Sequence, residues 1–420
     1  MLQVLSSAWA LLLGVGLLMV GNGLQGTLLG VRGNIEGFST LEMSFIMSAY
    51  FVGFLGGSRL APEMIRRVGH VRVFAALASF ISSVMILYPL VATPWAWILG
   101  RVVIGFCFSG VYVTAESWLN NAADNQNRGK ALSLYMIVQM VGIVSAQGLM
   151  LVGDPSGFDN FVIASVLISV SFAPILLSVS PTPSFETTRP MSIGRLLKTS
   201  PLGCAGMFLL GGVFSAQFGM SAVYGAKAGL SVAQISIFIS AIYIGAMILQ
   251  YPLGWLSDRM DRRQLIVVVA AVGAMGAVLG FFLGGHFGVL LVASFLIGGT
   301  TNPLYSLLIA HTNDYLEHGD MAAASGGLIF INGVGAIAGP LITGWLMNDH
   351  VFGPPGYFVL IAFLLFALGG YATWRMTQRA SIPVEYAGAV SPMSPVGTPM
   401  AVELARDVTL EAPREEQTTA

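Results

Sequence analysis

The sequence predicts an all-α membrane protein in which twelve transmembrane helices form two pseudo-symmetric six-helix bundles. Charged residues make up 9% of the 420-residue chain and hydrophobic residues 55%, with a mean hydropathy of +0.79, whereas soluble domains carry about 25% charged residues. Such a chain must be solvated by lipid, so its backbone must hydrogen-bond within helices or a closed barrel. The apolar runs reach about twenty residues without polar–apolar alternation, which favours spanning helices over barrel strands.

Twelve apolar runs account for most of the chain. They predict spanning helices at residues 7–30, 39–60, 71–92, 95–119, 130–152, 159–179, 202–226, 232–256, 264–285, 287–311, 322–347 and 355–377. The first run is too long for the apolar core of a signal peptide and has no basic segment before it, so we assign it as a span.

The lysine and arginine residues indicate the topology. All but three of the 19 lie in alternate gaps between the predicted spans or after the last one, and the exceptions are Arg32, Lys227 and Arg101, which lies within a span. The positive-inside rule therefore predicts a multi-pass protein of the bacterial inner membrane with both termini in the cytoplasm. The gap between the tenth and eleventh spans departs from the pattern, because it is acidic and contains no lysine or arginine.

The sequence gives no support for an enzyme. It has no HExxH, Walker A, GxSxG or CxxC motif, and its two cysteines, Cys107 and Cys204, both lie within predicted spans. We therefore expect no cofactor, metal site or structural disulfide. Since the basic residues are explained by topology, we expect no nucleic-acid partner. The expected partners are a small-molecule substrate, protons and membrane lipid, and the expected state is a monomer.

Short repeated segments indicate a duplicated unit. SAYFVG at 48–53 aligns with SAIYIG at 240–245, 192 residues later, and AESWLN at 115–120 aligns with TNDYLE at 312–317. We therefore predict six-helix bundles at residues 1–179 and 202–377. A cytoplasmic linker at 180–201 contains MSIGRLLK, a candidate short helix along the membrane surface, and a proline-rich, disordered cytoplasmic tail follows at 378–420.

One loop carries a specific resemblance. GWLSDRMDRR at 254–263 lies between the eighth and ninth spans, and it resembles the signature of the loop between the second and third helices of each half in the major facilitator superfamily. Asp261 stands where the family commonly has a glycine. The positions that match the signature are Gly254, Asp258, Arg259, Arg262 and Arg263.

The first half holds a degenerate copy of this signature. Pro62 and Arg66 replace its glycine and aspartate, whereas Arg67 and Gly69 are retained. RVVIG at 101–105 resembles the second motif of the family. The segments LAPEMIRRVGHVRVF and TPMAVELA are similar to a YcaD-like branch of bacterial members.

The resemblance implies a transporter whose loop motifs act as a cytoplasmic gate. In the family, the Asp and Arg of the loop pair with neighbouring helix ends and separate when the halves rock. We expect Asp258 and Arg259 to form the working latch, because the first copy is degenerate. The gate residues implied by the two copies are Arg67, Gly69, Gly254, Asp258, Arg259, Arg262 and Arg263.

Ionisable groups inside spans are costly and mark function or pairing. Helical geometry places Arg101, Gly105 and Tyr112 on one face, and the family's arginine at this motif is linked to substrate binding or proton movement. Arg101 could hold an anionic substrate, tune a nearby carboxylate, or serve a structural role on backbone carbonyls. Glu116 is the candidate proton carrier, and it could also pair with a gate arginine, Arg67 or Arg128.

Amide and aromatic side chains complete the candidate site. The polar residues avoid the third, sixth, ninth and twelfth spans, which are peripheral in this fold, although interhelical hydrogen bonding is an alternative role for each. Gln217 and Tyr224 share a helix face at i, i+7, whereas we expect phenylalanines to be packing or lipid-facing residues. The candidates for substrate binding or proton coupling are Asn22, Gln25, Arg101, Tyr112, Glu116, Gln139, Gln217, Tyr224, Asn302, Tyr305 and Asn332.

These features predict a secondary active transporter. We expect it to move a small organic solute, anionic or zwitterionic, by alternating access with proton coupling. The alternatives are proton-driven efflux of amphipathic drugs, or a membrane sensor or scaffold that does not transport. The fifth span lacks the Gly-Pro run of the family's antiport motif, which argues against drug efflux.

Overall fold

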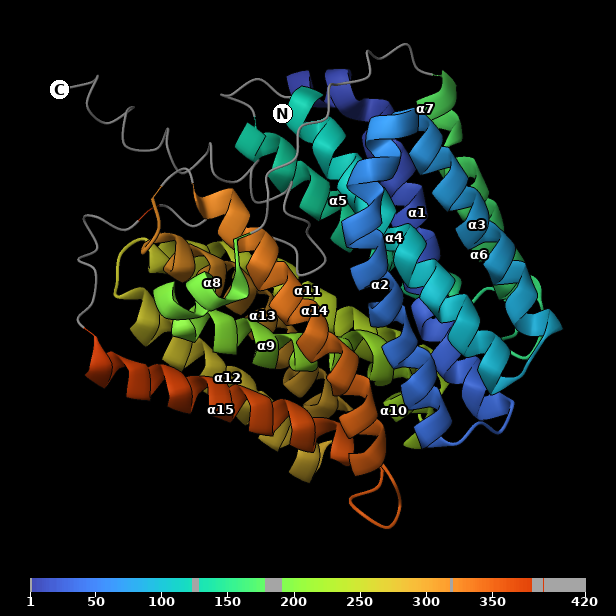
Figure 1. Ribbon diagram of the computed structural model, residues 1–420. Helices are drawn as coiled ribbons and strands as arrows, with labels where there is room; N and C mark the ends of the chain where they lie inside the picture. The colour runs from blue at the N-terminus through green and yellow to red at the C-terminus, as the bar shows by residue number, and fades with distance from the viewer. Residues whose placement is uncertain (1, 123–127, 178–190, 318–319, 380–387, 389–420) are drawn as a thin grey trace.

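The computed structural model describes residues 2–122, 128–177, 191–317, 320–379 and 388. Every regular element within these residues is a helix, and twelve helical segments are long and apolar enough to cross a membrane (Figure 1). The predicted all-α class and twelve spans are therefore confirmed. The predicted tail, apart from its first residues and residue 388, and the first half of the predicted linker lie outside the described residues.

The first bundle contains six spans, of which the last is broken into two helices. Its elements are α1 (Leu2–Ile35), α2 (Thr40–Val68), α3 (His70–Leu90), α4 (Pro94–Ala122), α5 (Arg128–Leu149), α6 (Asp159–Ser171) and α7 (Ala173–Leu177).

The second bundle follows a short helix, α8 (Ile193–Thr199), which confirms the helix predicted in the linker. The first span of this bundle is interrupted by a π-helical turn. Its elements are α9 (Pro201–Ser215), η2 (Ala216–Met220), α10 (Ser221–Lys227), α11 (Val232–Ser257), α12 (Arg262–Leu283), α13 (Phe287–Asn313), α14 (Met321–Leu346) and α15 (Gly356–Gln378).

The two bundles repeat the same packing. In the first, α2 packs on α4, α1 on α5, and α3 on α6; in the second, α11 packs on α13, α9 on α14, and α12 on α15. The second span of each bundle begins with a capping box, Ser39 with Glu42 and Ser231 with Gln234, which satisfies the first free amides of the helix. These boxes are 192 residues apart, the separation of the repeated segments.

Glycines bring paired helices into close contact. In the first bundle Gly53 faces the Val102 carbonyl and Gly105 faces the Tyr50 carbonyl, so neither position has room for a Cβ atom. In the second bundle, Gly245 and Gly298 make the equivalent approach between α11 and α13. Small residues permit such close backbone packing in membranes, so the α2–α4 and α11–α13 pairs pack closely in the same way in both halves.

The bundles touch each other at one end and diverge toward the other (Figure 1). We call the first the closed end. There Gly30 of α1 lies against Ala222 of α10, and Gly344 of α14 lies against Ser44 of α2. Lys227 also crosses between the bundles, since its Nζ donates to Thr40 Oγ1 at 3.0 Å.

The opposite end holds the α2–α3 and α11–α12 loops, α8 and the end of α15, and we call it the arginine-rich end. The predicted acidic gap lies here, where it neutralises arginines from neighbouring segments. Asp320 pairs with Arg195 of α8 at 2.5 Å, and Asp314 pairs with Arg262 of α12 at 2.5 Å. The acidic loop between α13 and α14 therefore forms ion pairs with the linker helix α8 and with the start of α12.

Candidate functional site

A cavity lies between the two bundles. Helices α1, α2, α4 and α5 form one wall, and α9, η2, α10, α11 and α14 form the other. The cavity volume that water molecules can occupy, measured at their centres, is about 80 Å³. This volume is enough for several waters. Polar side chains in the wall are Asn22, Gln25, Thr27, Arg101, Gln147, Gln217 and Asn332, and aromatic ones are Tyr50, Phe51, Phe54, Phe214, Phe218 and Tyr243.

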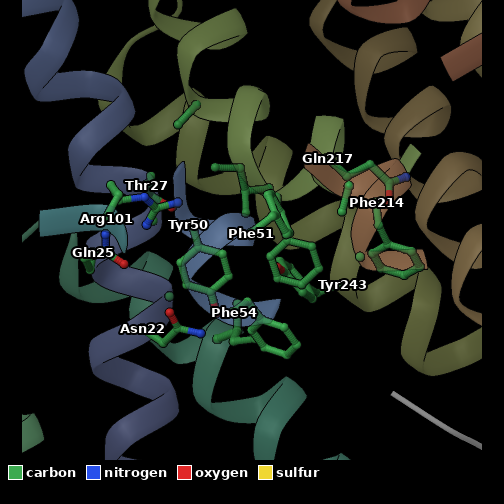
Figure 2. Close-up of a pocket in the computed structure, with 18 of the residues that line it drawn as sticks. Asn22, Gln25, Thr27, Tyr50, Phe51, Phe54, Arg101, Phe214, Gln217 and Tyr243 are labelled. Atoms are coloured by element: carbon green, nitrogen blue, oxygen red, sulfur yellow. The ribbon is translucent and has the colours of Figure 1, made fainter. Parts of the chain in front are cut away.

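Several polar atoms of this wall have no hydrogen-bond partner among the described residues. Both amide atoms of Gln25, Nε2 of Gln217 and Nε of Arg101 are buried in this way. Buried polar groups are normally paired, because an unpaired one loses its hydration without compensation. These atoms come from both bundles, and Figure 2 shows Arg101 and Gln25 on one side and Gln217 on the other. The cavity is therefore provided with donors and an acceptor for a polar ligand.

Arg101 is the only charged side chain among the described residues of the wall, and it is 5% exposed. Its guanidinium lies 4.7 Å above the centre of the Tyr50 ring, and Nη2 is 3.5 Å from the sulfur of Met47. It makes no ion pair with a described residue. A buried charge without a counter-charge is unfavourable, so this site would gain from an anionic group in the cavity.

The π-helical turn positions Gln217. A π-turn contains one residue more than an α-turn and is frequent at functional sites. Gln217 lies in η2, and Thr301 of α13 donates from Oγ1 to its Oε1 at 3.2 Å, which orients the amide; Nε2 is buried without a partner among the described residues.

The same turn makes the expectation for Tyr224 wrong. We expected Gln217 and Tyr224 to share a face at i, i+7, which holds only for a continuous α-helix. The extra residue rotates the following segment, and Tyr224 instead stacks on Tyr357 with ring centres 5.1 Å apart, edge-on to Phe358. Tyr224 is therefore part of the second bundle's aromatic core.

The other predicted residues divide into three groups. Asn22, Gln25, Arg101, Gln217 and Asn332 line the cavity. Tyr112 and Tyr305 lie one layer behind it: Asn22 Nδ2 donates to the Tyr112 hydroxyl at 3.3 Å, and the Tyr305 ring meets Phe214 edge-on. The remaining candidates, which are buried outside the cavity wall, are Glu116, Gln139 and Asn302.

Glu116 is fully buried within the first bundle. The Tyr135 hydroxyl donates to its Oε1 at 3.4 Å. Arg67, one of its two expected partners, instead pairs with Glu63 on the surface of α2 at 2.6 Å, because the two are one helical turn apart. The side chain of the other, Arg128, lies outside the described residues.

The aromatic part of the wall was not anticipated, because phenylalanines were assigned to packing or to lipid. The sequence contained one signal for it. Phe51 and Tyr243 occupy equivalent positions in the repeated segments SAYFVG and SAIYIG, and both line the cavity. Tyr50 and Phe54, one turn apart on α2, extend the same surface, so the repeat marked the cavity wall from both halves.

Of the two residues expected to form the latch, Arg259 contacts the end of its own helix. It is exposed, with its guanidinium 4.1 Å above the Trp255 ring and Nη1 donating to the Trp255 carbonyl. Nearby, Arg262 and Asp314 form a buried ion pair, with side chains 4% and 7% exposed. Arg262 begins α12 and Asp314 ends α13, so the helix ends bring them together.

Other gate residues have structural roles at the arginine-rich end. Arg263 pairs with Asp261, the cap of α12, at 3.2 Å. Gly69 has φ of 84° and ends α2, a backbone conformation that favours glycine. Gly254 and Asp258 line a separate pocket between α5, α11 and α13.

Burial raises the pKa of the Asp314 carboxyl above its ordinary value, and Arg262 offsets only part of that rise. Two further contacts come from residue 388. Its carbonyl accepts from Arg262 Nη2 at 2.6 Å, and its amide donates to Asp314 Oδ1 at 3.3 Å. Both partners of the ion pair are thus also bonded to one backbone unit of the C-terminal segment.

Comparison with known proteins agrees with this architecture. The sequence model described as "Major Facilitator Superfamily" matches residues 11–228 and 202–406, one match for each bundle. The chain belongs to the Major Facilitator Superfamily. The two matches overlap at residues 202–228 and together cover the spans of both bundles of this superfamily member.

Relatives of this superfamily member carry the name "Uncharacterized MFS-type transporter YcaD". The protein of Escherichia coli O45:K1 is 28% identical over 336 residues, covering 79% of this chain and 86% of the relative. The protein of Salmonella arizonae is 25% identical over 315 residues, covering 74% and 81%. The predicted similarity to a YcaD-like branch of the superfamily is confirmed.

Solved structures of superfamily members share the fold. A variant of the nucleoside transporter NupG superposes with a TM-score of 0.75 at 15% identity, covering 88% of this chain and 99% of that one. A bacterial homologue of the lysosomal transporter Spinster gives 0.66 at 15% identity, covering 97% and 98%. FucP gives 0.58 at 13%, covering 89% and 99%. The chain is thus a transporter-family protein with this superfamily's fold.

Proposed function

We propose that the protein is a secondary active transporter that moves a small anionic or zwitterionic organic solute across the bacterial inner membrane. Movement occurs by alternating access and is coupled to protons, and the arginine-rich end faces the cytoplasm. The observation that carries this proposal is the cavity between the bundles, in which Arg101 is the one charged side chain among the described wall residues. A site shared by two halves that touch at one end can be exposed to either side when the halves rock.

The chemistry of the wall supports the substrate class. Arg101 attracts a carboxylate, sulfonate or phosphate, because its buried charge has no described counter-ion. The amides of Gln25 and Gln217 supply hydrogen bonds from opposite bundles, and their unpaired atoms are satisfied when a polar solute binds. Aromatic rings from both halves suit a flat or ring-bearing body. We therefore favour an acid with an unsaturated or cyclic framework over a lipophilic cation.

Unfolding measurements on the purified protein test the substrate class. Anionic, zwitterionic and cationic solutes are added separately, because a ligand that binds only the folded state stabilises it by about 2.7 kcal/mol at 100 times its Kd. We expect stabilisation by an acid in the wild type and its loss in Arg101→Ala. Arg72→Ala, which removes an exposed arginine at the arginine-rich end, is the control and should respond like the wild type.

The other outcomes decide between the alternatives. Stabilisation only by lipophilic cations would favour drug efflux, and no response across a broad panel would favour the sensor or scaffold. An acid that stabilises Arg101→Ala as strongly as the wild type would remove Arg101 from the site.

Glu116 is the proposed proton carrier. It is a fully buried acid bonded to Tyr135, and it lies one helical turn from Tyr112, whose hydroxyl contacts Asn22 in the cavity wall. We propose that protons pass between the cavity and the carboxyl group along Asn22 and Tyr112.

We expect Glu116→Gln to abolish accumulation driven by a pH gradient in proteoliposomes, while exchange of labelled for unlabelled substrate continues. Exchange needs only the rocking of the loaded protein, whereas accumulation needs the proton. Glu42→Gln is the matched control, because glutamine already fills the same capping position in the second bundle at Gln234. Gradient-driven accumulation that survives in Glu116→Gln would contradict the assignment.

A further inference from the structure

A second pocket lies at the arginine-rich end of the second bundle, outside the central cavity. The start of α9, the start of α12, the end of α13 and the end of α15 surround it. Four basic side chains line it: Arg263, His311, Arg375 and Arg379. They come from three helices that are distant in sequence, so the fold itself gathers them.

The charge of this pocket is only partly neutralised. Arg263 pairs with Asp261, and His311 is buried with its ring edge-on to Tyr315. Neither Arg375 nor Arg379 makes an ion pair with a described residue. The remaining positive charge therefore rests on these two arginines.

The geometry holds Arg379 in place. Its guanidinium lies 3.9 Å above the Tyr315 ring, and Nη1 donates to the Thr199 carbonyl at 3.2 Å. Its own carbonyl accepts from Arg263 Nη1 at 2.6 Å. A guanidinium fixed by a ring and a carbonyl loses little freedom when an anion binds.

Helix α9 adds to the field in the pocket. Its first residues, Pro201 and Leu202, line the pocket, and Ser200 caps the helix through the Gly203 amide at 3.2 Å. The N-terminal end of a helix carries a partial positive charge. The helix end and the arginines therefore both favour the binding of an anion.

Aromatic residues adjoin Arg375 on α15. Trp374 precedes Arg375 and is 53% exposed, and its ring packs on Tyr371. Aromatic residues beside basic ones at the end of a spanning helix are typical of the membrane interface. The end of α15 therefore has the composition of a segment at the level of the lipid headgroups.

We propose that this pocket binds the phosphate group of an anionic phospholipid headgroup. The arginines and the start of α9 recognise the phosphate, and Trp374 and Tyr371 contact the region where headgroup and chains meet. Inorganic phosphate could bind the same arginines, but it would make no contact with Trp374 and Tyr371. We therefore favour the lipid. The bound headgroup links the ends of four helices of the second bundle, and this inference is independent of the proposed substrate.

Native mass spectrometry and thermal unfolding of the full-length protein in detergent test this inference. The probes are phosphatidylglycerol, zwitterionic phosphatidylcholine and inorganic phosphate. A basic residue near an anionic lipid contributes about 1 kcal/mol, so Arg375→Gln and Arg379→Gln should each weaken phosphatidylglycerol binding about fivefold. Arg375→Gln is structurally the milder change, since the one described contact of Arg375 outside its helix backbone is a ring 5.7 Å away.

Matched variants separate this pocket from general charge effects. Arg375→Lys keeps the charge and should retain most of the binding. The double variant Arg66→Gln/Arg72→Gln removes two exposed arginines at the same end of the first bundle and should bind phosphatidylglycerol like the wild type.

Three results would overturn the proposal. They are equal retention of phosphatidylglycerol and phosphatidylcholine, unchanged phosphatidylglycerol binding in the Arg375→Gln/Arg379→Gln double variant, and stabilisation by millimolar inorganic phosphate without any effect of the lipid. The last would assign the pocket to a soluble phosphate.

Discussion

Replacing Asp314 by alanine is expected to destabilise the protein by about 3–5 kcal/mol, because it leaves the buried guanidinium of Arg262 without its counter-charge. Both side chains of this pair are almost inaccessible to solvent. The attraction within the pair mainly offsets the cost of burying two charges. The double variant Arg262→Met/Asp314→Leu, which removes both charges, should therefore recover most of the lost stability.

The exposed pair of Arg195 and Asp320 is the control. Its atoms are also 2.5 Å apart, but its side chains are 61% and 29% exposed, and surface ion pairs contribute about 0–1 kcal/mol. Unfolding of Asp320→Ala should therefore differ little from the wild type. Equal losses in Asp314→Ala and Asp320→Ala would show that burial does not set the contribution of these ion pairs to stability.

The pH dependence of stability tests the same Arg262–Asp314 pair. Since the folded-state pKa of Asp314 lies above its ordinary value, the folded protein takes up this proton more readily than the unfolded chain. The contribution of the carboxyl to folding therefore becomes more favourable as the pH falls through that pKa. Asp314→Asn lacks the titration, so the stability of the wild type relative to Asp314→Asn should rise as the pH falls through the raised pKa, which unfolding measurements across a pH series would show.

Substituting leucine for Gly30 should force the closed end apart. A side chain there meets Ala222 and the backbone of α10, and overpacking costs about 1–3 kcal/mol. An energy of that size changes an equilibrium between two states about 5- to 150-fold. We expect the distance between spin labels at Ile35 and Ala228, one on each bundle near this end, to lengthen in Gly30→Leu.

Gly26, one turn earlier on the same helix, is the matched control. It lines the central cavity and has no atom within 4 Å of an added Cβ. Gly26→Leu should leave the label distance unchanged and weaken ligand binding by filling the cavity. An unchanged distance in Gly30→Leu would mean that the α1–α10 contact does not control closure.

The spans could be predicted because a membrane requires long apolar runs, and the duplication because paired segments such as SAYFVG and SAIYIG keep a nearly constant separation. Polar residues in otherwise apolar helices marked much of the cavity, including Arg101 and Gln25. Two features depended on information that local pattern does not contain. The rotation of Tyr224 follows from hydrogen bonds of a single π-turn, and the Arg262–Asp314 pair follows from how α12 and α13 end.

That π-turn also connects the cavity to the closed end along one membrane crossing. Gln217 and Phe218 of the turn contribute to the cavity wall, and just beyond it Ala222 both lines the cavity and contacts Gly30 at the closed end. One residue of an α-helix corresponds to about 100° of rotation, so the extra residue of the turn sets which side chain of α10 faces α1. A small side chain at position 222 therefore serves ligand binding and bundle closure together, and a larger one should affect both.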